Sequence, residues 1–141
     1  MYTLIYMSSA INKLSEEEIN VLLVQSRHYN IDNHVTGVLL YIDGDFLQVL
    51  EGNKKDVELL FEKIKRDKRH KGIIVVYEGS KTQRQFPDWS MGFHSSTYEI
   101  LRDLSGFEEL NKRDLLNIKD KTAISFLETF MTSHKEKVTF W

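Results

Sequence analysis

The chain has 141 residues, of which 28% are charged and 41% hydrophobic, and a formal net charge of −2. This composition is typical of a single globular domain that buries a sizeable core, and the absence of cysteine excludes disulfides, thiolate catalysis and cysteine metal sites. Because it has neither a strong basic patch nor a membrane-length apolar run, we expect a soluble, cytoplasmic protein that binds neither nucleic acid nor membrane.

The first strand and helix are marked by an apolar run and a capping box. Residues 2–8 are apolar at both odd and even positions, which predicts a strand covered on both faces. Ser15 and Glu18 have the spacing of a capping box, and apolar residues at helical spacing continue to about Tyr29. Asn30 falls at the predicted end of this helix, where a side-chain amide tolerates a left-handed turn. Taken alone, Asn30 is interpreted as a helix-ending residue.

A hairpin and a second helix follow. Residues 34–41 predict the second strand, and Asp43-Gly44 is a hairpin signal that joins it to an apolar strand at residues 46–50. Asn53 is suited to the N-cap of a second helix that ends near Arg66. The buried stripe of this helix is formed by apolar residues three or four apart, namely Val57, Leu60, Phe61 and Ile64.

Two more strands complete the predicted sheet. Residues 73–77 form an unbroken, mainly β-branched run after Gly72, which predicts a central strand covered on both faces. A polar loop at residues 79–85 precedes the only proline, Pro87, and a last strand is expected at about residues 89–93. The order is β-α-β-β-α-β-β, that of a ferredoxin-like sandwich with one added strand. We therefore expect an α+β fold in which a five-stranded mixed sheet carries two helices on one face.

The second face of this sheet is also apolar and needs its own cover. The strand residues concerned are Ile5, Leu47 and Val49. Ser96 and Glu99 have capping-box spacing before a short helix, and a further set of apolar residues marks a longer helix near the C-terminus. That set is Ala123, Ile124, Leu127, Phe130 and Met131. We predict a sheet domain at residues 1–94 and a helical cap at residues 95–141 that packs on the far face or exchanges onto a partner subunit.

Gln48, in the middle of the apolar strand 46–50, is the most informative polar residue in the chain. Its amide brings donors and an acceptor into a dry layer, where each unpaired group costs about 1–3 kcal/mol. Tyr6 lies on the first strand, which neighbours the third in this topology, so the two side chains can pair facing the helices. Trp89 and Met91 could flank the pair, although such residues are more often ordinary core. A glutamine bonded to another side chain or to water is the alternative interpretation.

Enzyme signatures are absent from the sequence. The five histidines show no paired metal-ligand spacing, and neither a phosphate-binding loop nor a dinucleotide fingerprint occurs. The acidic residues around Asp43 flank a turn, where carboxylates are usually turn formers. The residues therefore predict neither a catalytic site nor a metal site.

Several motifs occur together and in order over residues 1–93. They are Tyr6-x-Ser8, Ser26-Arg27 followed by Asn30, Thr36-Gly37-Val38-Leu39, Asp45-Phe46-Leu47-Gln48-Val49-Leu50-Glu51-Gly52, Asp67-Lys68-Arg69-His70 and Phe86-Pro87-Asp88-Trp89-Ser90-Met91. This set resembles the BLUF family of blue-light sensors that use FAD. The C-terminal third is similar to the cap helices of short, single-domain BLUF proteins only in length and helicity.

The resemblance implies a non-covalently bound FAD whose ring slots between the two helices, edge-on to the sheet. Tyr6 would donate an electron and a proton after illumination, and the hydrogen bonds of Gln48 would rearrange to give a reversible red-shifted state. Asn30 would hold the carbonyl and ring-nitrogen edge of the flavin, and Leu22 and Ile64 would sandwich the ring. The implied cofactor-binding residues are Tyr6, Leu22, Asn30, Phe46, Gln48, Lys63, Ile64, Asp67, Arg69 and His70. The implied photochemical switch comprises Tyr6, Ser8, Gln48, Trp89 and Met91, and the family leaves open whether Trp89 or Met91 points inward.

On this resemblance, residues 1–94 are the flavin-binding sensor and residues 95–141 an output extension. We expect a photoreceptor that is not an enzyme and that signals to a downstream protein partner, as a homo-oligomer of two or more copies. Two alternatives stay open. One is a cofactor-free ferredoxin-like interaction module in which Tyr6, Asn30 and Gln48 are structural, and the other is a flavin-dependent redox enzyme on the same scaffold.

Overall fold

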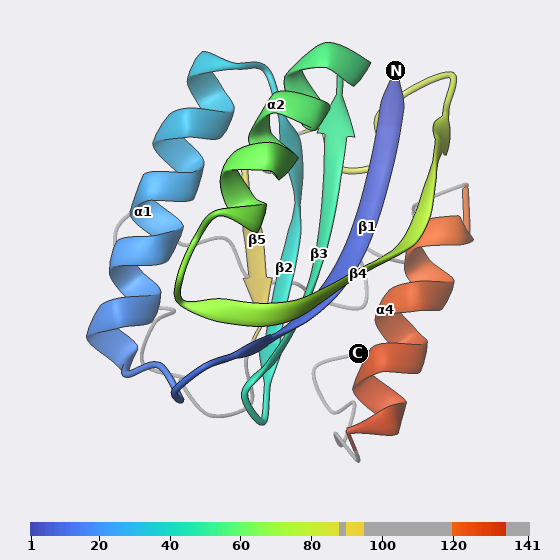
Figure 1. The fold of residues 1–141 in the computed structure, drawn as a ribbon. Helices are drawn as coiled ribbons and strands as arrows, with labels where there is room; N and C mark the ends of the chain where they lie inside the picture. The colour runs from blue at the N-terminus through green and yellow to red at the C-terminus, as the bar shows by residue number, and fades with distance from the viewer. Residues whose placement is uncertain (88–89, 95–119, 135–141) are drawn as a thin grey trace.

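The fold consists of one mixed sheet with helices on both faces (Figure 1). The computed structural model describes residues 1–87, 90–94 and 120–134. Its elements in chain order are β1 (Tyr2–Ala10), α1 (Glu16–Asp32), β2 (Thr36–Ile42), β3 (Asp45–Gly52), α2 (Lys54–Lys65), β4 (His70–Ser80), β5 (Gly92–His94) and α4 (Thr122–Ser133). The strand order is β4-β1-β3-β2-β5, antiparallel throughout except for the parallel β2–β5 pair. The predicted α+β class and the β-α-β-β-α-β-β order are confirmed.

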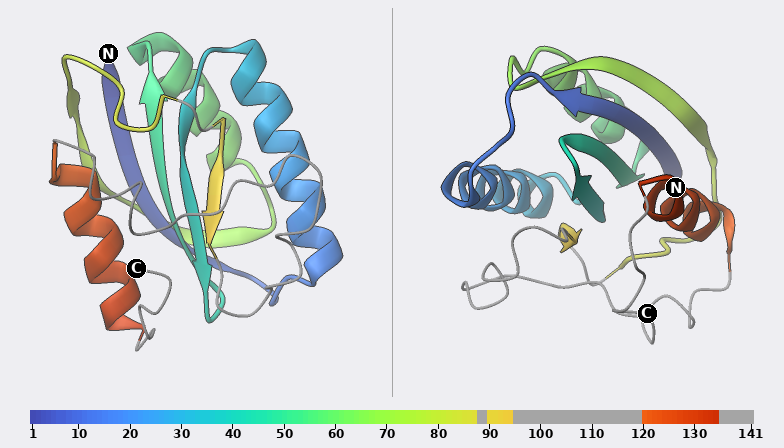
Figure 2. Two further views of the ribbon diagram at one scale, coloured as in Figure 1. Left: turned by 180° about the vertical axis from the view of Figure 1, so that it is seen from behind. Right: turned by 90° about the horizontal axis from the view of Figure 1, so that it is seen from below.

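Two apolar layers cover the two faces of the sheet. α1 and α2 lie on one face and α4 on the other (Figure 2). Because side chains alternate along a strand, Tyr6 of β1 belongs to the cluster under α1 and α2, whereas its neighbour Ile5 belongs to the cluster under α4. On β3, Leu47 and Val49 face α4 as predicted, with Gln48 between them on the opposite face. All five apolar residues predicted for the C-terminal helix are buried in α4.

Local sequence signals lie at the starts of α1 and α2 and at the turn between β2 and β3. Ser15 Oγ accepts a hydrogen bond from the Glu18 N–H at 3.2 Å, and Glu18 Oε1 accepts one from the Ser15 N–H at 3.0 Å, so the capping box is formed. Asn53 occupies the N-cap position of α2 without a side-chain capping bond. Asp43 and Gly44 have φ values of 51° and 83°, and two successive positive φ values are those of a type I′ hairpin turn.

The prediction that residues 73–77 form a central strand is wrong. β4 runs from His70 to Ser80 and lies at the edge of the sheet, where it pairs with β1. Ile74 and Val75 are 64% and 41% exposed. β-Branched residues favour extended backbone, but whether a strand is covered depends on its neighbours in the sheet, and an apolar run does not contain that information. Since residues 79 and 80 belong to β4, the polar loop starts later than predicted.

Two predicted boundaries also differ. α1 continues to Asp32, so Asn30 is helical and does not end the helix; the left-handed backbone is at His34, with φ 56°. The last strand covers only residues 92–94, and the chain bends at Ser90 and Met91 just before it. The capping box predicted at Ser96 and the residue Trp89 lie outside the described residues. Within the described part of the chain, no helix has the length and apolarity needed to cross a membrane.

Candidate functional site

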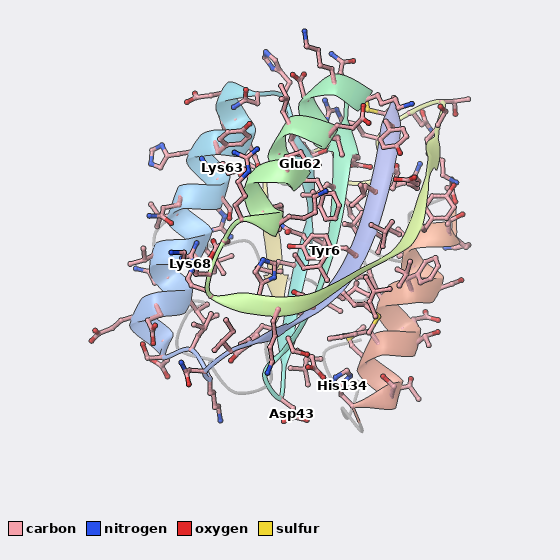
Figure 3. All side chains as sticks on the ribbon, in the orientation of Figure 1. Tyr6, Asp43, Glu62, Lys63, Lys68 and His134 are labelled. Atoms are coloured by element: carbon pink, nitrogen blue, oxygen red, sulfur yellow. The ribbon has the colours of Figure 1, made fainter. Side chains whose placement is uncertain are left out.

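Tyr6 and Gln48 are opposite each other in the β1–β3 ladder. Tyr6 lies in the layer between the sheet and α2 (Figure 3). The Tyr6 hydroxyl donates a hydrogen bond to Gln48 Oε1. The two residues are 4% and 5% exposed, so the prediction that they form a buried pair is confirmed. Burial, reinforced by the negative charge of Asp67, raises the pKa of the Tyr6 phenol well above its ordinary value. The phenol therefore keeps its proton and acts as a donor to the amide.

The other end of the Gln48 amide faces Met91. Gln48 Nε2 donates to Met91 Sδ at 3.5 Å, and the Met91 side chain is fully buried. A thioether sulfur only accepts hydrogen bonds, and weakly, whereas a phenol can donate. The two neighbours thus favour the same amide orientation, with Oε1 toward Tyr6 and Nε2 toward Met91. The sequence left open whether Trp89 or Met91 points toward this site. The Met91 side chain does so, and Trp89 is not among the described residues.

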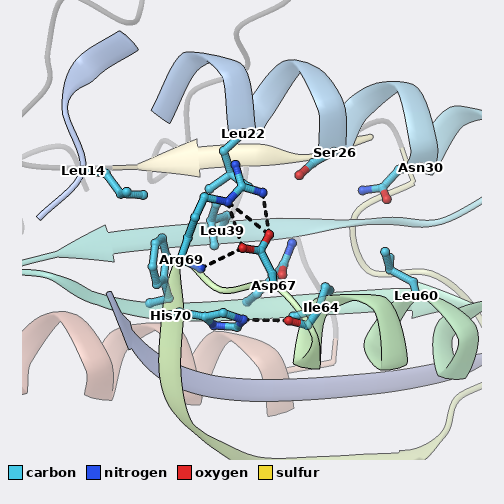
Figure 4. Close-up of a pocket in the computed structure, with 12 residues that line it drawn as sticks. Leu14, Leu22, Ser26, Asn30, Leu39, Leu60, Ile64, Asp67, Arg69 and His70 are labelled. Atoms are coloured by element: carbon cyan, nitrogen blue, oxygen red, sulfur yellow. Dashed lines mark hydrogen bonds and ion pairs between the residues drawn. The ribbon is translucent and has the colours of Figure 1, made fainter. Parts of the chain in front are cut away.

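A cavity opens beside this pair, between α1 and α2 (Figure 4). Its volume is about 80 Å³. It is lined by Leu14, Leu22, Ser26, Asn30, Leu39, Phe46, Gln48, Leu60, Ile64, Asp67, Arg69 and His70. Seven predicted cofactor-binding residues, Leu22, Asn30, Phe46, Ile64, Asp67, Arg69 and His70, therefore line one space together with Gln48.

α1 supplies one wall of the cavity through a single helical stripe. Leu22, Ser26 and Asn30 follow each other at intervals of four residues, which places them on one helix face. Leu22 and Asn30 were predicted, whereas Ser26 was quoted only as part of a motif. Its spacing from Asn30 is the sequence signal that could have assigned it to the cavity. Leu14, Leu39 and Leu60 also line the space and carry no sequence signal beyond their apolar character.

Asn30 and Arg27 of α1 hold the segment that carries Met91. Asn30 is 1% exposed, and its Nδ2 donates to the Ser90 carbonyl at 2.6 Å. Arg27 Nε and Nη2 both donate to the Met91 carbonyl, at 3.1 and 3.0 Å. Asn30 therefore touches both the cavity and the chain next to Gln48. The contact of Arg27 was not predicted, although Arg27 is three residues from Asn30 and so shares its helix face.

An ion pair and a histidine border the cavity near the end of α2. Arg69 binds Asp67 through both its Nε and Nη2 groups (Figure 4), and these hydrogen bonds lower the pKa of the Asp67 carboxyl below its usual range. His70 Nε2 lies 2.7 Å from the Ile64 carbonyl and therefore donates to it, while the Ser8 hydroxyl lies 2.7 Å from His70 Nδ1. His70 thus connects α2 to β1 two residues from Tyr6.

Lys63 is not brought to the cavity with the other predicted residues. Its side chain is exposed, and its Nζ lies over the ring of Tyr29 of α1, 4.6 Å from the ring centre. The contact links α1 to α2 outside the cavity lining. The contact between Lys63 and the cofactor that the family resemblance implies stays a prediction. Among the described residues, no group of three or more histidines and acids is placed to hold a metal ion.

The cavity residues fit a flavin ring in chemistry. Leu22 and Ile64 present apolar faces from opposite helices, and the buried amides of Asn30 and Gln48 offer donors and acceptors to a polar ring edge. The volume of about 80 Å³ is below the roughly 300–1,000 Å³ of ordinary ligand pockets. Lining side chains must therefore move apart for a flavin ring to enter.

Residues 1–92 match the protein-family model described as "BLUF: Sensors of blue-light using FAD". The chain belongs to the BLUF family. FAD is accordingly the cofactor of this BLUF domain, and the domain senses blue light through the flavin. Every residue that lines the cavity between α1 and α2 lies within the matched region.

Curated relatives of this BLUF domain include light-activated enzymes. The photoactivated adenylate cyclase subunit beta of Euglena longa is 31% identical over 132 residues, which cover 93% of this chain and 14% of that protein. The subunit alpha of Euglena gracilis is 32% identical over 133 residues, which cover 94% of this chain and 12% of that protein. The chain thus spans less than a sixth of the length of either cyclase subunit.

Solved structures share the fold. A bacterial light-regulated adenylyl cyclase superposes with a TM-score of 0.67 at 33% identity, over 95% of this chain and 34% of that chain. BlsA in its ground state gives a TM-score of 0.67 at 28% identity and covers 99% of this chain and 93% of its own. BlrB, a BLUF protein in its dark state, gives 0.63 at 28% identity over 94% and 96%. BlsA and BlrB are thus matched over nearly their whole length.

Proposed function

We propose that this BLUF domain senses blue light through a switch formed by Tyr6 and Gln48, with Met91 and Ser8 as neighbours of that pair. The observation that carries the proposal is the buried hydrogen bond from the Tyr6 hydroxyl to Gln48 Oε1 beside the cavity. A phenol and an amide in a dry layer form few alternative arrangements. A change in either residue therefore changes the hydrogen bonding of the other.

The residues proposed to hold the FAD ring are those of the cavity. Leu22 and Ile64 pack on its two faces, Asn30 and Gln48 bind its polar edge, and Phe46, Asp67, Arg69 and His70 surround them. Lys63 is proposed only to stabilise the α1–α2 approach through Tyr29. When bound, FAD supplies the absorption of blue light and an excited state that accepts an electron.

Tyr6 is proposed to be the residue that gives up an electron and a proton. Its raised pKa keeps the neutral phenol protonated. Loss of an electron makes a phenol strongly acidic, so the proton then leaves along the existing hydrogen bond toward Gln48 Oε1. Gln48 is the group that can respond, because an amide presents either an acceptor or a donor to Tyr6 after rotation by half a turn.

Met91 biases the choice between the two amide orientations. Its sulfur accepts from Gln48 Nε2 in the arrangement described and would face an oxygen after rotation. A neutral hydrogen bond contributes a net of about 0.5–1.5 kcal/mol. The two arrangements are therefore separated by a few kcal/mol at most, which is the gap that a thermally reversible switch requires.

We propose that the signal leaves through β3 and α4. Leu47 and Val49 flank Gln48 on β3 and belong to one apolar cluster with Leu127 and Phe130 of α4. A shift of Gln48 along its strand would move these two side chains and so change their packing against α4. Adjacent packing supports this route, and coupling measurements must test it.

A polar contact supports the same route at the end of α4. His134 Nε2 lies 2.8 Å from Asp45 Oδ2, and Ser9 Oγ donates to Asp45 Oδ1 at 2.7 Å. Ser9 and Asp45 are register partners three residues from Tyr6 and Gln48, respectively. The end of α4 is therefore bonded to the two strands that carry the proposed switch.

The domain is proposed to pass its signal on through a protein–protein interaction and to catalyse no reaction itself. We expect a downstream protein partner, a change within a homo-oligomer, or both. The cyclase relatives support such an arrangement, because this chain matches a small part of their length. Covalent linkage to an output enzyme and binding to a separate partner are two versions of the same signalling role.

The test is reconstitution with FAD followed by illumination. The protein should become yellow, shift its absorption band to longer wavelength under blue light and return in the dark over repeated cycles. FAD binding without a light-induced shift would contradict the sensor proposal. Steady turnover of a reductant by the flavin-loaded protein in the dark would favour a redox enzyme instead.

A further inference from the structure

The segment that carries Met91 is hydrogen-bonded to α1. The chain bends at Ser90 and Met91, and β5 follows as a strand of three residues at the sheet edge. Such a short edge strand fixes its flanking residues weakly. Within the described residues, the Ser90 and Met91 carbonyls accept hydrogen bonds from Asn30 and Arg27. α1 therefore fixes two successive peptide groups next to the Gln48 site.

Arg27 forms stronger hydrogen bonds to this segment than Asn30 does. Its Nε and Nη2 groups approach one carbonyl oxygen at 3.1 and 3.0 Å, so that two donors of the planar guanidinium share a single acceptor. Hydrogen bonds from a charged donor are stronger than those between neutral groups. The planar fork of arginine can place two N–H groups on one oxygen, whereas the lysine ammonium is a point charge without this geometry.

The position of the Met91 backbone determines where its sulfur lies. The Met91 side chain is fully buried, and its Sδ accepts a hydrogen bond from Gln48 Nε2 at 3.5 Å. Because a thioether is a weak acceptor, a displacement of the Met91 backbone changes this contact. The position of the Gln48 amide therefore depends on α1 through Arg27 and Met91.

We propose that Arg27 is a positioning residue that fixes the Met91 thioether against the Gln48 amide and thereby sets the lifetime of the light-induced state. The inference rests on the proposed switch at Gln48. It predicts that Arg27 acts on the photocycle only through Met91. An arginine that merely stabilises the fold would instead change the thermal unfolding temperature and leave the photocycle as it is.

A double-mutant cycle separates these two roles. The variants are Arg27→Ala, Met91→Leu and the two combined, each loaded with FAD, and the measurement is the dark-recovery rate after a blue flash. We expect each single variant to change the rate by about fivefold or more, the effect of roughly 1 kcal/mol of lost hydrogen bonding. The combined variant should recover at the rate of Met91→Leu, because the hydrogen bonds that connect Arg27 to Gln48 run through Met91.

Two further variants secure the result. Arg27→Lys keeps the charge and the aliphatic stem but not the fork, so it should show the altered recovery rate with little loss of stability. It takes the place of Arg27→Ala in the cycle should that variant not fold. Gln25→Ala, at an exposed position of the same helix, should recover at the wild-type rate.

The outcomes distinguish this inference from the proposed function. A wild-type protein with no light-induced shift overturns the sensor mechanism, and this inference with it. A normal shift in wild type with unchanged recovery in the Arg27 variants overturns this inference alone. So does a combined variant whose effect is the product of the two single effects, because Arg27 would then act by a route that bypasses Met91.

Discussion

Tyr6 and Gln48 are direct register partners on β1 and β3, and the phenol of the first donates to the amide oxygen of the second. Strand alternation places both side chains under α1 and α2, away from α4. The pair is therefore next to the cavity on one face, while the strand residues on either side of Gln48 contact the helix on the other. This arrangement connects the cavity to α4, the proposed output helix, through a single strand.

Removing the Tyr6 hydroxyl should stop the photocycle and weaken the fold. Tyr6→Phe keeps the ring that packs on Phe61 but leaves Gln48 Oε1 without its donor. An unsatisfied buried acceptor costs about 1–3 kcal/mol, so the free energy of unfolding, measured with urea, should fall by that amount. FAD should still bind, with no reversible red shift. Tyr29→Phe, outside the cavity lining, is the matched control and should cycle; cycling by Tyr6→Phe would remove Tyr6 from the mechanism.

Asn30 should contribute directly to FAD affinity. Asn30→Ala removes the amide that lines the cavity and the bond to the Ser90 carbonyl. Loss of one net hydrogen bond to the ring, about 1.4 kcal/mol, corresponds to a tenfold weaker Kd in a fluorescence titration. The control is Asn33→Ala, which removes an amide on the same helix end that bonds to the Tyr29 carbonyl. Equal affinity of Asn30→Ala and wild type would place the ring elsewhere.

The contact of His134 with Asp45 should make stability depend on pH. Both ring nitrogens lie near acceptors, Asp45 Oδ2 at 2.8 Å and the Phe130 carbonyl at 2.7 Å, so the charged imidazolium satisfies them best. Burial alone would lower the pKa of His134, but these hydrogen bonds and the negative charges of Asp45 and Asp43 outweigh it and raise the pKa. A raised pKa in the folded state means that the contribution to stability is complete below the ordinary value near 6.5 and is lost as pH rises through the raised one.

The measurement is the free energy of unfolding between about pH 6 and pH 9, compared with that of His134→Gln. Wild type should lose more stability than the variant over this range. His28→Gln, exposed on α1, is the control and should follow wild type. Parallel pH profiles for wild type and His134→Gln would show that the contact does not hold α4.

The packing of α4 on the sheet can be tested by truncation of one core residue. Leu127 is fully buried in the cluster with Leu47 and Val49. Leu127→Ala should lower the free energy of unfolding by about 2–5 kcal/mol, from lost burial and the cavity left behind. Glu128→Ala, at the exposed neighbouring position, should change it little. A small effect of Leu127→Ala would mean that α4 is not stably packed on this face.

The buried pair could be predicted because strand alternation gives the face of each side chain and the β-α-β-β-α-β order makes the first and third strands neighbours. The same kind of signal failed for β4, where Ile74 and Val75 are exposed, since coverage depends on sheet order. Arg27 was missed because its partner is a backbone carbonyl 64 residues away, and no side-chain pattern marks such a contact. The family resemblance implies that Lys63 contacts the cofactor; its exposed side chain is not part of the cavity lining, and the contact stays a prediction.

The most direct test compares wild type with Gln48→Leu, both loaded with FAD, in one light-minus-dark absorption experiment. Leucine has a similar volume and cannot offer either amide orientation to Tyr6. Wild type should show a reversible shift to longer wavelength, and Gln48→Leu should bind FAD and show none. A normal reversible shift in Gln48→Leu, or a yellow wild-type protein whose spectrum does not change under blue light, would contradict a switch at Gln48.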